Sequence, residues 1–159
     1  MPLTIRPAQP QDAATIHGFI VELAIYERAE HEVVASIDDI RNSLFAEGTP
    51  TRALIGELDG QPIGHAVYFY SYSTWLGRNG IYLEDLYITP EHRGSGAGRA
   101  LLQQIAREAV ANGCGRLEWS VLDWNEPAIG FYRKLGAVAQ DEWVKYRLDG
   151  QALRDFAAV

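Results

Sequence analysis

The segment Glu91–Val110, EHRGSGAGRALLQQIAREAV, joins a glycine-rich turn directly to an amphipathic helix. Three glycines stand at alternate positions, and an arginine stands at each end of the run. At a helix N-terminus, backbone N–H groups that no side chain covers, with positive charge beside them, form a cradle for an anion such as pyrophosphate. The same glycine spacing also serves tight turns and close backbone packing that bind no ligand, so the flanking sequence has to decide between these roles.

The composition of the chain predicts one globular domain over residues 1–159. With 159 residues, 47% of them hydrophobic, the chain can bury roughly 70% of its unfolded surface. The net charge of -7 argues against nucleic acid as a partner, because phosphate binding needs clustered Lys and Arg. This charge suits a small cationic partner, although an acidic balance also serves solubility alone.

The cysteine and histidine content limits the kind of site. Cys114 is the single cysteine, which excludes an internal disulfide and a cysteine-built zinc site and favours the reducing cytoplasm. The four histidines show no metal-ligand spacing, and we assign no metal. The N-terminus has no signal pattern, and no run reaches the ~20 apolar residues of a membrane span. We therefore expect a soluble, cytoplasmic protein without a membrane partner.

The hydrophobic periodicity changes along the chain from helical to strand-like and back. Helical spacing begins at Ile16 and Phe19, and Ser36 with Asp39 forms a capping-box variant before a second helix. We expect strands at residues 3–8, 51–58, 61–72, 79–90, 115–122 and 142–148, and helices at residues 9–29, 36–45 and 125–136 and after the glycine run. Asp59-Gly60 predicts a tight turn that joins the second and third strands into a hairpin. This order predicts an α/β fold, with one mixed sheet and helices on both of its faces.

Two nucleotide-binding motifs contain similar glycine patterns. A Walker loop is excluded because RGSGAGR has no Gly-Lys-Ser/Thr ending. A Rossmann fingerprint is harder to exclude, since Glu118 stands about 20 positions after the glycines, where that motif carries an acidic residue. An antiparallel meander before the turn, however, does not form the βαβ unit of a dinucleotide site. The sequence therefore favours a pyrophosphate cradle of another kind.

Three blocks of the sequence resemble a known family. RGSGAG after LYITPEH resembles the Arg/Gln-x-x-Gly-x-Gly/Ala signature of the GNAT superfamily of acetyl-CoA-dependent N-acetyltransferases. ELAIYER, YLEDLYITPEHRGSGAG and WNEPAIGFYRKLGA, in this order, resemble its diamine acetyltransferase branch, which includes spermidine/spermine and thialysine acetyltransferases. The resemblance runs from about Ile5 to about Leu148, nearly the full chain.

The resemblance implies the GNAT acyl-CoA N-acyltransferase fold, a central and mostly antiparallel sheet flanked by helices. It also implies acetyl-CoA as co-substrate, a small-molecule amine as acceptor, and a homodimer with active sites near its interface. The residues that it implies for binding acetyl-CoA are Leu86, Tyr87, Ile88, Arg93, Gly94, Ser95, Gly96, Ala97, Gly98, Arg99 and Asn125. Backbone N–H groups of the first three can also stabilise an oxyanion, because a bulged or splayed strand leaves such donors unpaired.

Acetylation of an amine needs a base. An amine with a pKa near 10.4 is mostly protonated at pH 7, and freeing its lone pair costs about 4.6 kcal/mol. Glu84 and Asp85 are neighbours on a predicted strand, so they face opposite sides unless a bulge intervenes. By resemblance, Glu84 takes the amine proton through water and Asp85 shapes the substrate end. Without the resemblance, the two could be an ordinary solvated pair.

The leaving thiolate needs an acid. Tyr132 follows the WNEPAI turn, and its phenol carries a proton at neutral pH. By resemblance Tyr132 is the proton donor, whereas taken alone it reads as a core aromatic. Asn125 binds the coenzyme by resemblance, and it can also cap a helix before Pro127.

The resemblance also implies which residues bind the substrate amine. By resemblance, Tyr26 and Glu27 recognise the amine, and Trp75 offers an aromatic wall for a cation, unless it only packs the hairpin. Polyamine-acetylating relatives carry an acidic residue close before that tryptophan, where this chain has Ser73 and Thr74, which puts spermidine and spermine in doubt. The alternatives left open are acetylation of a protein amino group and a non-catalytic acyl-CoA-binding module.

Overall fold

A computed structural model of the chain describes residues 2–158. The chain forms two compact units, Met1–Leu122 and Asp123–Val159, and each is described by itself. The first unit contains the sheet with α1, α2 and α3, and the second contains α4 and α5. Within residues 2–158, no helix is long and apolar enough to cross a membrane.

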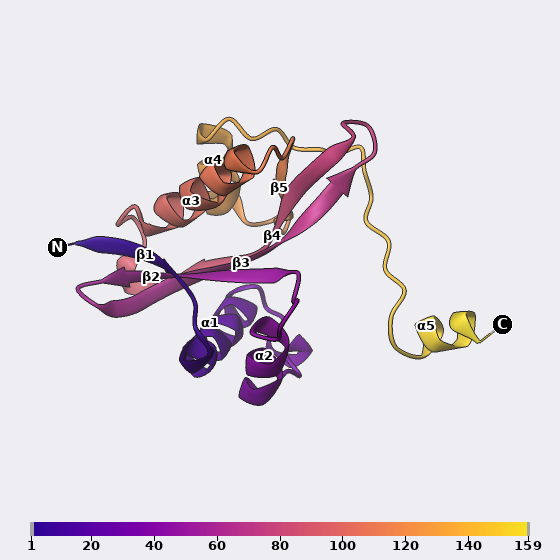
Figure 1. Ribbon diagram of the computed structural model, residues 1–159, viewed down its shortest axis with the longest axis horizontal. Helices are drawn as coiled ribbons and strands as arrows, with labels where there is room; N and C mark the ends of the chain where they lie inside the picture. The colour runs from indigo at the N-terminus through magenta and orange to yellow at the C-terminus, as the bar shows by residue number, and fades with distance from the viewer. Residues whose placement is uncertain (1, 159) are drawn as a thin grey trace. The chain divides into compact units, whose positions relative to one another are not determined.

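The first unit is built on a five-stranded sheet with the order β1-β2-β3-β4-β5 (Figure 1). The strands are β1 (Leu3–Pro7), β2 (Thr51–Leu58), β3 (Gln61–Ser73), β4 (Arg78–Ile88) and β5 (Leu117–Trp119). The first four are antiparallel, and β5 runs parallel to β4. The predicted mixed sheet is therefore confirmed, although β5 is shorter than the sequence indicated.

Helices cover both faces of this sheet, as expected. Figure 1 shows α1 (Ala13–Tyr26) and α2 (Ile37–Leu44) on one face and α3 (Ala97–Ala111) on the other. Short 3-10 turns occupy Pro10–Asp12, Glu30–Glu32 and Pro90–His92. The last of these turns lies between the end of β4 and the glycine run.

The two faces of the sheet hold two sets of buried side chains. On the α1 side, Ile16 packs in a core with Ala53 and Ile55 of β2. On the α3 side, Leu101 and Ile105 are fully buried, as the helical spacing predicted. Each such side chain stabilises the fold by about 1.5–3 kcal/mol, so the sheet is firmly held between the helices.

Local signals in the sequence are confirmed at the caps and turns. Ser36 caps α2 by accepting a 3.0 Å hydrogen bond from the N–H of Asp39, and Asp39 Oδ2 accepts one of 2.8 Å from the N–H of Ser36. Asp59 and Gly60 both adopt positive φ, 51° and 77°, as a two-residue hairpin turn requires.

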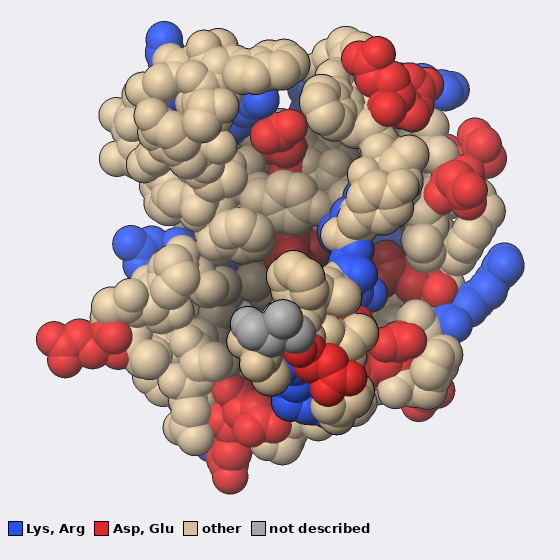
Figure 2. Space-filling view, turned by 90° about the vertical axis from the view of Figure 1, so that its right-hand side faces the viewer, with Lys and Arg blue, Asp and Glu red and all other residues tan. Residues whose placement is uncertain are grey.

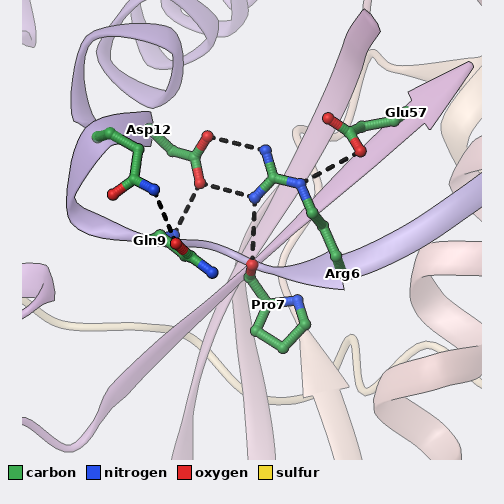
Figure 3. A network of polar contacts seen from close by, with 6 residues as sticks. Arg6, Pro7, Gln9, Asp12 and Glu57 are labelled. Carbon is green, nitrogen blue, oxygen red and sulfur yellow. Dashed lines mark hydrogen bonds and ion pairs between the residues drawn. The ribbon is translucent and has the colours of Figure 1, made fainter. Parts of the chain in front are cut away.

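A polar network joins β1 to the start of α1 (Figure 3). Arg6 Nη1 and Nη2 donate to the two carboxylate oxygens of Asp12 at 2.8 and 2.9 Å, and Arg6 Nε lies 3.2 Å from Glu57 Oε1. The backbone N–H of Gln9 donates to Asp12 at 2.7 Å. Hydrogen bonds from Arg6 hold the pKa of Asp12 below its usual value.

β4 carries a bulge at Glu84. Val67 of β3 lies opposite Asp85, whereas the next residue, Tyr68, lies opposite Leu83. Glu84 therefore has no opposite residue on β3, and the alternation of side chains reverses across it. Before the bulge Leu83 faces α3 with Tyr68, and after it Asp85 faces α1.

The second unit consists of α4 (Glu126–Lys134), a segment without helix or strand, and α5 (Gly150–Ala157). The strand predicted at residues 142–148 is wrong, because this segment pairs with no strand among residues 2–158. The alternation of Val144, Tyr146 and Leu148 is present, but these side chains are exposed. Alternation shows that one face of a segment is apolar, and a strand needs a partner as well.

Candidate active site

The bulge directs Asp85 toward the C-terminal end of α1. Its Oδ2 lies 3.9 Å from Nε2 of His65, whose ring packs 5.5 Å from the ring of Phe19 on α1. Glu27, directly after α1, is close enough to be affected by the Asp85 charge. Burial, and then the Asp85 carboxylate, raise the pKa of Glu27 above its usual value. Two carboxylates in partial burial favour a cation between them.

A hollow of about 260 Å³ lies at the C-terminal half of α1. It is lined by Glu22, Ile25, Tyr26, Tyr87, Pro90 and Arg93. The Arg93 guanidinium lies 5.1 Å from the centre of the Tyr26 ring and 5.7 Å from that of Tyr87. The Tyr87 hydroxyl donates to Glu22 at 3.2 Å. The hollow is therefore lined by one acidic and one basic side chain and by the rings of two tyrosines.

The other edge of β4 is open beyond the bulge. Thr89 donates its N–H to the carbonyl of Ile63 on β3 at 2.8 Å. Because backbone directions alternate along a strand, the N–H groups of Leu86 and Ile88 point away from β3, and that of Tyr87 points toward it. β5 pairs with β4 only at Ile81–Leu83. Within the described chain, no strand therefore pairs with these two donors.

The glycine run forms the N-terminus of α3. Gly94 and Gly96 adopt φ values of 81° and 89°, and Gly96 is the N-cap residue. A Cβ added at either glycine would meet nothing within 4 Å, and one at Gly98 would only touch Ile88 at 3.7 Å. The glycine run therefore leaves open space at the start of α3, where the first backbone N–H groups have no acceptor within the helix. Arg99 adds positive charge to this end of the helix, whereas the Arg93 guanidinium lies in the hollow over Tyr26 and Tyr87.

Tyr132 and Asn125 belong to the second unit. Tyr132 lies on α4 with its ring 5.5 Å from that of Phe131. Asn125 is buried and caps α4, its Oδ1 accepting a 3.4 Å hydrogen bond from the N–H of Ala128. The capping role predicted for Asn125 is confirmed.

Trp75 does not join Tyr26 and Glu27 within one chain. It lies on the turn between β3 and β4, where 79% of its surface is exposed and the Arg116 guanidinium is 5.9 Å from its ring. The path along β4 from this turn to the bulge at Glu84 measures about 20 Å, at about 3.3 Å per residue. Ser73 stands where polyamine-acetylating relatives carry an acidic residue. It accepts a 3.2 Å hydrogen bond from the N–H of Leu76 and so shapes the turn.

Sequence reasoning missed two residues beside the site, Glu22 and His65. Glu22 stands one helical turn before Tyr26, so the spacing of four could have found it. His65 interrupts an apolar run in β3, and a lone polar residue at such a place is a weak signal.

Comparison with known proteins agrees with this arrangement. The chain matches the acetyltransferase (GNAT) family over residues 11–137. Thialysine N-epsilon-acetyltransferase of Bos taurus is 39% identical over 164 residues, covering 96% of each protein. L-ornithine N5-acetyltransferase of Arabidopsis thaliana is 30% identical over 196 residues, covering 94% of this chain and 86% of that protein. A solved integron cassette protein from V. cholerae is similar with a TM-score of 0.83 and 26% identity, covering 100% of this chain and 99% of its own.

The family match covers most of the chain, and the sheet, the open edge of β4 and the glycine run agree with it. The relatives named above confirm the resemblance found in the sequence. The chain therefore belongs to the acetyltransferase (GNAT) family and is an acetyltransferase.

Proposed function

We propose that this enzyme transfers the acetyl group of acetyl-CoA to the terminal side-chain amine of a small, lysine-like amino acid. The observation that carries the proposal is the hollow at the end of α1. Glu22 and Arg93 line it with opposite charges, and Glu27 and Asp85 stand close in sequence to Tyr26 and Tyr87 of its wall. Thialysine and ornithine, named for two relatives, are both α-amino acids with a terminal amine. Such a substrate has a positive and a negative charge at the end remote from the reacting nitrogen.

Each end of the substrate has a partner in this proposal. Glu27 and Asp85 bind the α-ammonium, and Tyr26 provides an aromatic surface for it. The Arg93 guanidinium binds the α-carboxylate, since this planar group suits a carboxylate with two parallel hydrogen bonds. The reacting amine then lies toward Glu84, because that residue and Asp85 are adjacent on β4.

Members of this family take their acetyl group from acetyl-CoA, whose thioester supplies an activated acyl carbon. The residues that fit it are the uncovered glycine run at the start of α3, residues 94–99, and the backbone of Arg93. The open edge of β4 at Leu86 and Ile88 extends this surface, and by resemblance Asn125 of the second unit also binds the coenzyme. Tyr87 directs its backbone to β3 and contributes its side chain to the hollow instead.

The chemistry assigned to the chain's own residues is proton transfer and charge stabilisation. Glu84, exposed at the bulge, takes the proton of the substrate ammonium through water, which frees the amine lone pair. The N–H groups of Leu86 and Ile88 donate to the carbonyl oxygen as negative charge develops on it. Tyr132 donates its phenolic proton to the departing thiolate sulfur.

A homodimer is the proposed assembly. Trp75, Tyr72 and Leu76 are exposed at one hairpin end, and Val144, Tyr146 and Leu148 are exposed in the second unit. Exposed apolar groups of this extent suit contact with a second copy. A second copy would also bring a Trp75 to the active site, which a single chain does not.

We also propose that the chain is one catalytic domain that acts in the cytoplasm. The family match spans residues 11–137 and so crosses the boundary between the two units, which supports a single catalytic domain. On the face in Figure 2, acidic and basic side chains are interspersed, without the broad basic surface that a phosphate backbone needs. We propose a cytoplasmic enzyme that acts on small molecules, with neither nucleic acid nor a membrane as partner.

The test is an amine panel assayed for release of free thiol from acetyl-CoA. It contains thialysine, bis(2-aminoethyl) sulfide, which lacks the carboxylate, and 3-(2-aminoethylthio)propionate, which lacks the α-amine, with spermine and a lysine-containing peptide. We expect kcat/KM to be highest for thialysine, and about tenfold lower when a charge pairing of about 1.4 kcal/mol is lost. A preference for spermine or the peptide would overturn the substrate assignment. Acetyl-CoA binding without turnover of any amine would favour the non-catalytic alternative.

A further inference from the structure

His65 is the buried polar side chain that the proposed chemistry does not use. It lies on β3 opposite Tyr87, and its surface is 0% exposed. Neither ring nitrogen has a hydrogen-bond partner among residues 2–158. A buried donor left without a partner is costly to folding, so an imidazole in this place calls for an explanation.

The surroundings of the ring are apolar on most sides. Phe19 of α1 packs against it with ring centres 5.5 Å apart, and Ile55 of β2 and Tyr87 of β4 are its neighbours across the sheet. The imidazole therefore has little freedom to move.

The charged groups near His65 come from three places. Asp85 of β4 is nearest, with Oδ2 at 3.9 Å from Nε2. From α1 and the residue after it come Glu22, hydrogen-bonded to Tyr87, and Glu27, next to Asp85. Arg93 lies over the Tyr87 ring. Of these groups, Asp85 is the one whose oxygen approaches an imidazole nitrogen.

A small rotation of the Asp85 side chain would bring its carboxylate within hydrogen-bonding distance of His65. The separation of 3.9 Å exceeds a normal N–H···O distance by about 1 Å. Asp85 has a 25% exposed side chain and can rotate, whereas His65 is packed. Rotation of the carboxylate toward Nε2 satisfies the buried donor and fixes the direction of the other oxygen.

We propose that His65 is the positioning residue of Asp85: its Nε2–H donates to Oδ2 and turns Oδ1 toward the α-ammonium of the substrate. The inference rests on the proposed function, in which Asp85 binds that ammonium. A held carboxylate binds a cation with less loss of side-chain freedom than a free one. His65 thus sets the preference for amines that carry a second positive charge, without touching the substrate.

The kinetic test compares thialysine with 3-(2-aminoethylthio)propionate, which lacks only the α-amine. His65→Phe keeps a ring against Phe19 and removes the donor. We expect KM for thialysine to rise about tenfold with kcat nearly unchanged, and KM for the analogue to stay the same. His65→Gln, which restores an N–H donor, should recover most of the affinity. His17→Phe is the matched control, because His17 lies 2.8 Å from the carbonyl of Ala35 and away from the carboxylates.

A double-mutant cycle separates positioning from packing. In an Asp85→Asn background, His65→Phe should change KM for thialysine by less than about twofold, since the carboxylate it positions is gone. A rise equal to that in the wild-type background, or an equal rise for both amines, would show that His65 only packs, and would overturn the inference. An Asp85→Asn variant with wild-type KM would instead overturn the substrate assignment.

An NMR measurement tests the hydrogen bond without depending on enzyme activity. In two-bond ¹H–¹⁵N spectra of the full chain, His65 should be the Nε2–H tautomer, and Asp85→Asn should shift its Nε2 proton while leaving the resonances of His17 in place. An Nδ1–H tautomer, or a ring unaffected by Asp85→Asn, would refute the hydrogen bond even if no amine were acetylated.

Discussion

Arg6 of β1 and Asp12, which precedes α1, form a two-bonded ion pair at 2.8 and 2.9 Å. The Asp12 side chain is largely buried, and a neutral replacement would leave the guanidinium with Glu57 as its remaining carboxylate partner. We expect Asp12→Asn to lower the free energy of unfolding at pH 7 by about 2 kcal/mol. Because the pKa of Asp12 is lowered on folding, its contribution is present above the unfolded pKa and is lost as pH falls through the folded pKa. Urea unfolding from pH 7 to pH 2 measures this, and variant and wild type should converge in acid.

Gly98 offers the cleanest test of the cradle. Gly96 has a φ of 89°, so a side chain there would strain the backbone as well as fill the space. Gly98 is helical, and a Cβ there meets only Ile88 at an ordinary 3.7 Å. Gly98→Val should therefore fold and lose at least about tenfold in acetyl-CoA affinity, measured by calorimetry. Gly18→Val, at a helical glycine with open space in α1, is the control, and wild-type affinity in Gly98→Val would place the phosphates elsewhere.

Tyr132→Phe keeps the ring against Phe131 and removes the proton. We expect kcat to fall about 10²-fold or more, with little change in the affinity for acetyl-CoA, because a general acid acts in the transition state. Steady-state kinetics with calorimetry on the same protein measure both quantities. A kcat within a few-fold of wild type would reduce Tyr132 to a packing residue.

Glu84→Gln should lower kcat/KM for thialysine about 10²-fold at pH 7, because the variant cannot take the proton of the substrate ammonium. The loss should be smaller at pH 9, where more of the substrate amine is already deprotonated. Steady-state rates of variant and wild type at pH 7 and pH 9 measure this. The assignment would fail if the variant kept the wild-type rate at pH 7.

Light scattering at micromolar concentration should give about twice the 17.7 kDa chain mass. Trp75→Ala should raise KM for the amine if a second copy brings this side chain to the active site. A strict monomer with full activity would contradict the proposed assembly and the role of Trp75 together.

The sequence was most informative where one residue type has one structural use. Ser36 with Asp39, and Asp59 with Gly60, could be predicted because caps and tight turns depend on local chemistry. The strand expected at residues 142–148 was wrong, since alternation of apolar residues does not reveal whether a partner strand is present. His65 and Glu22 reach the site through contacts of α1 with β3 and β4, which are far from α1 in sequence. Such contacts leave no local pattern.

The bulge at Glu84 makes the number of residues in β4 more important than most of their identities. Leu83 faces one side of the sheet and Asp85 the other only because one extra residue stands between their partners on β3. Deleting Leu86 would restore regular pairing with Tyr87 still opposite His65, and would move Asp85 opposite Ala66, onto the α3 side of the sheet. The segment should thus tolerate many substitutions in evolution or in the laboratory, but very few insertions or deletions.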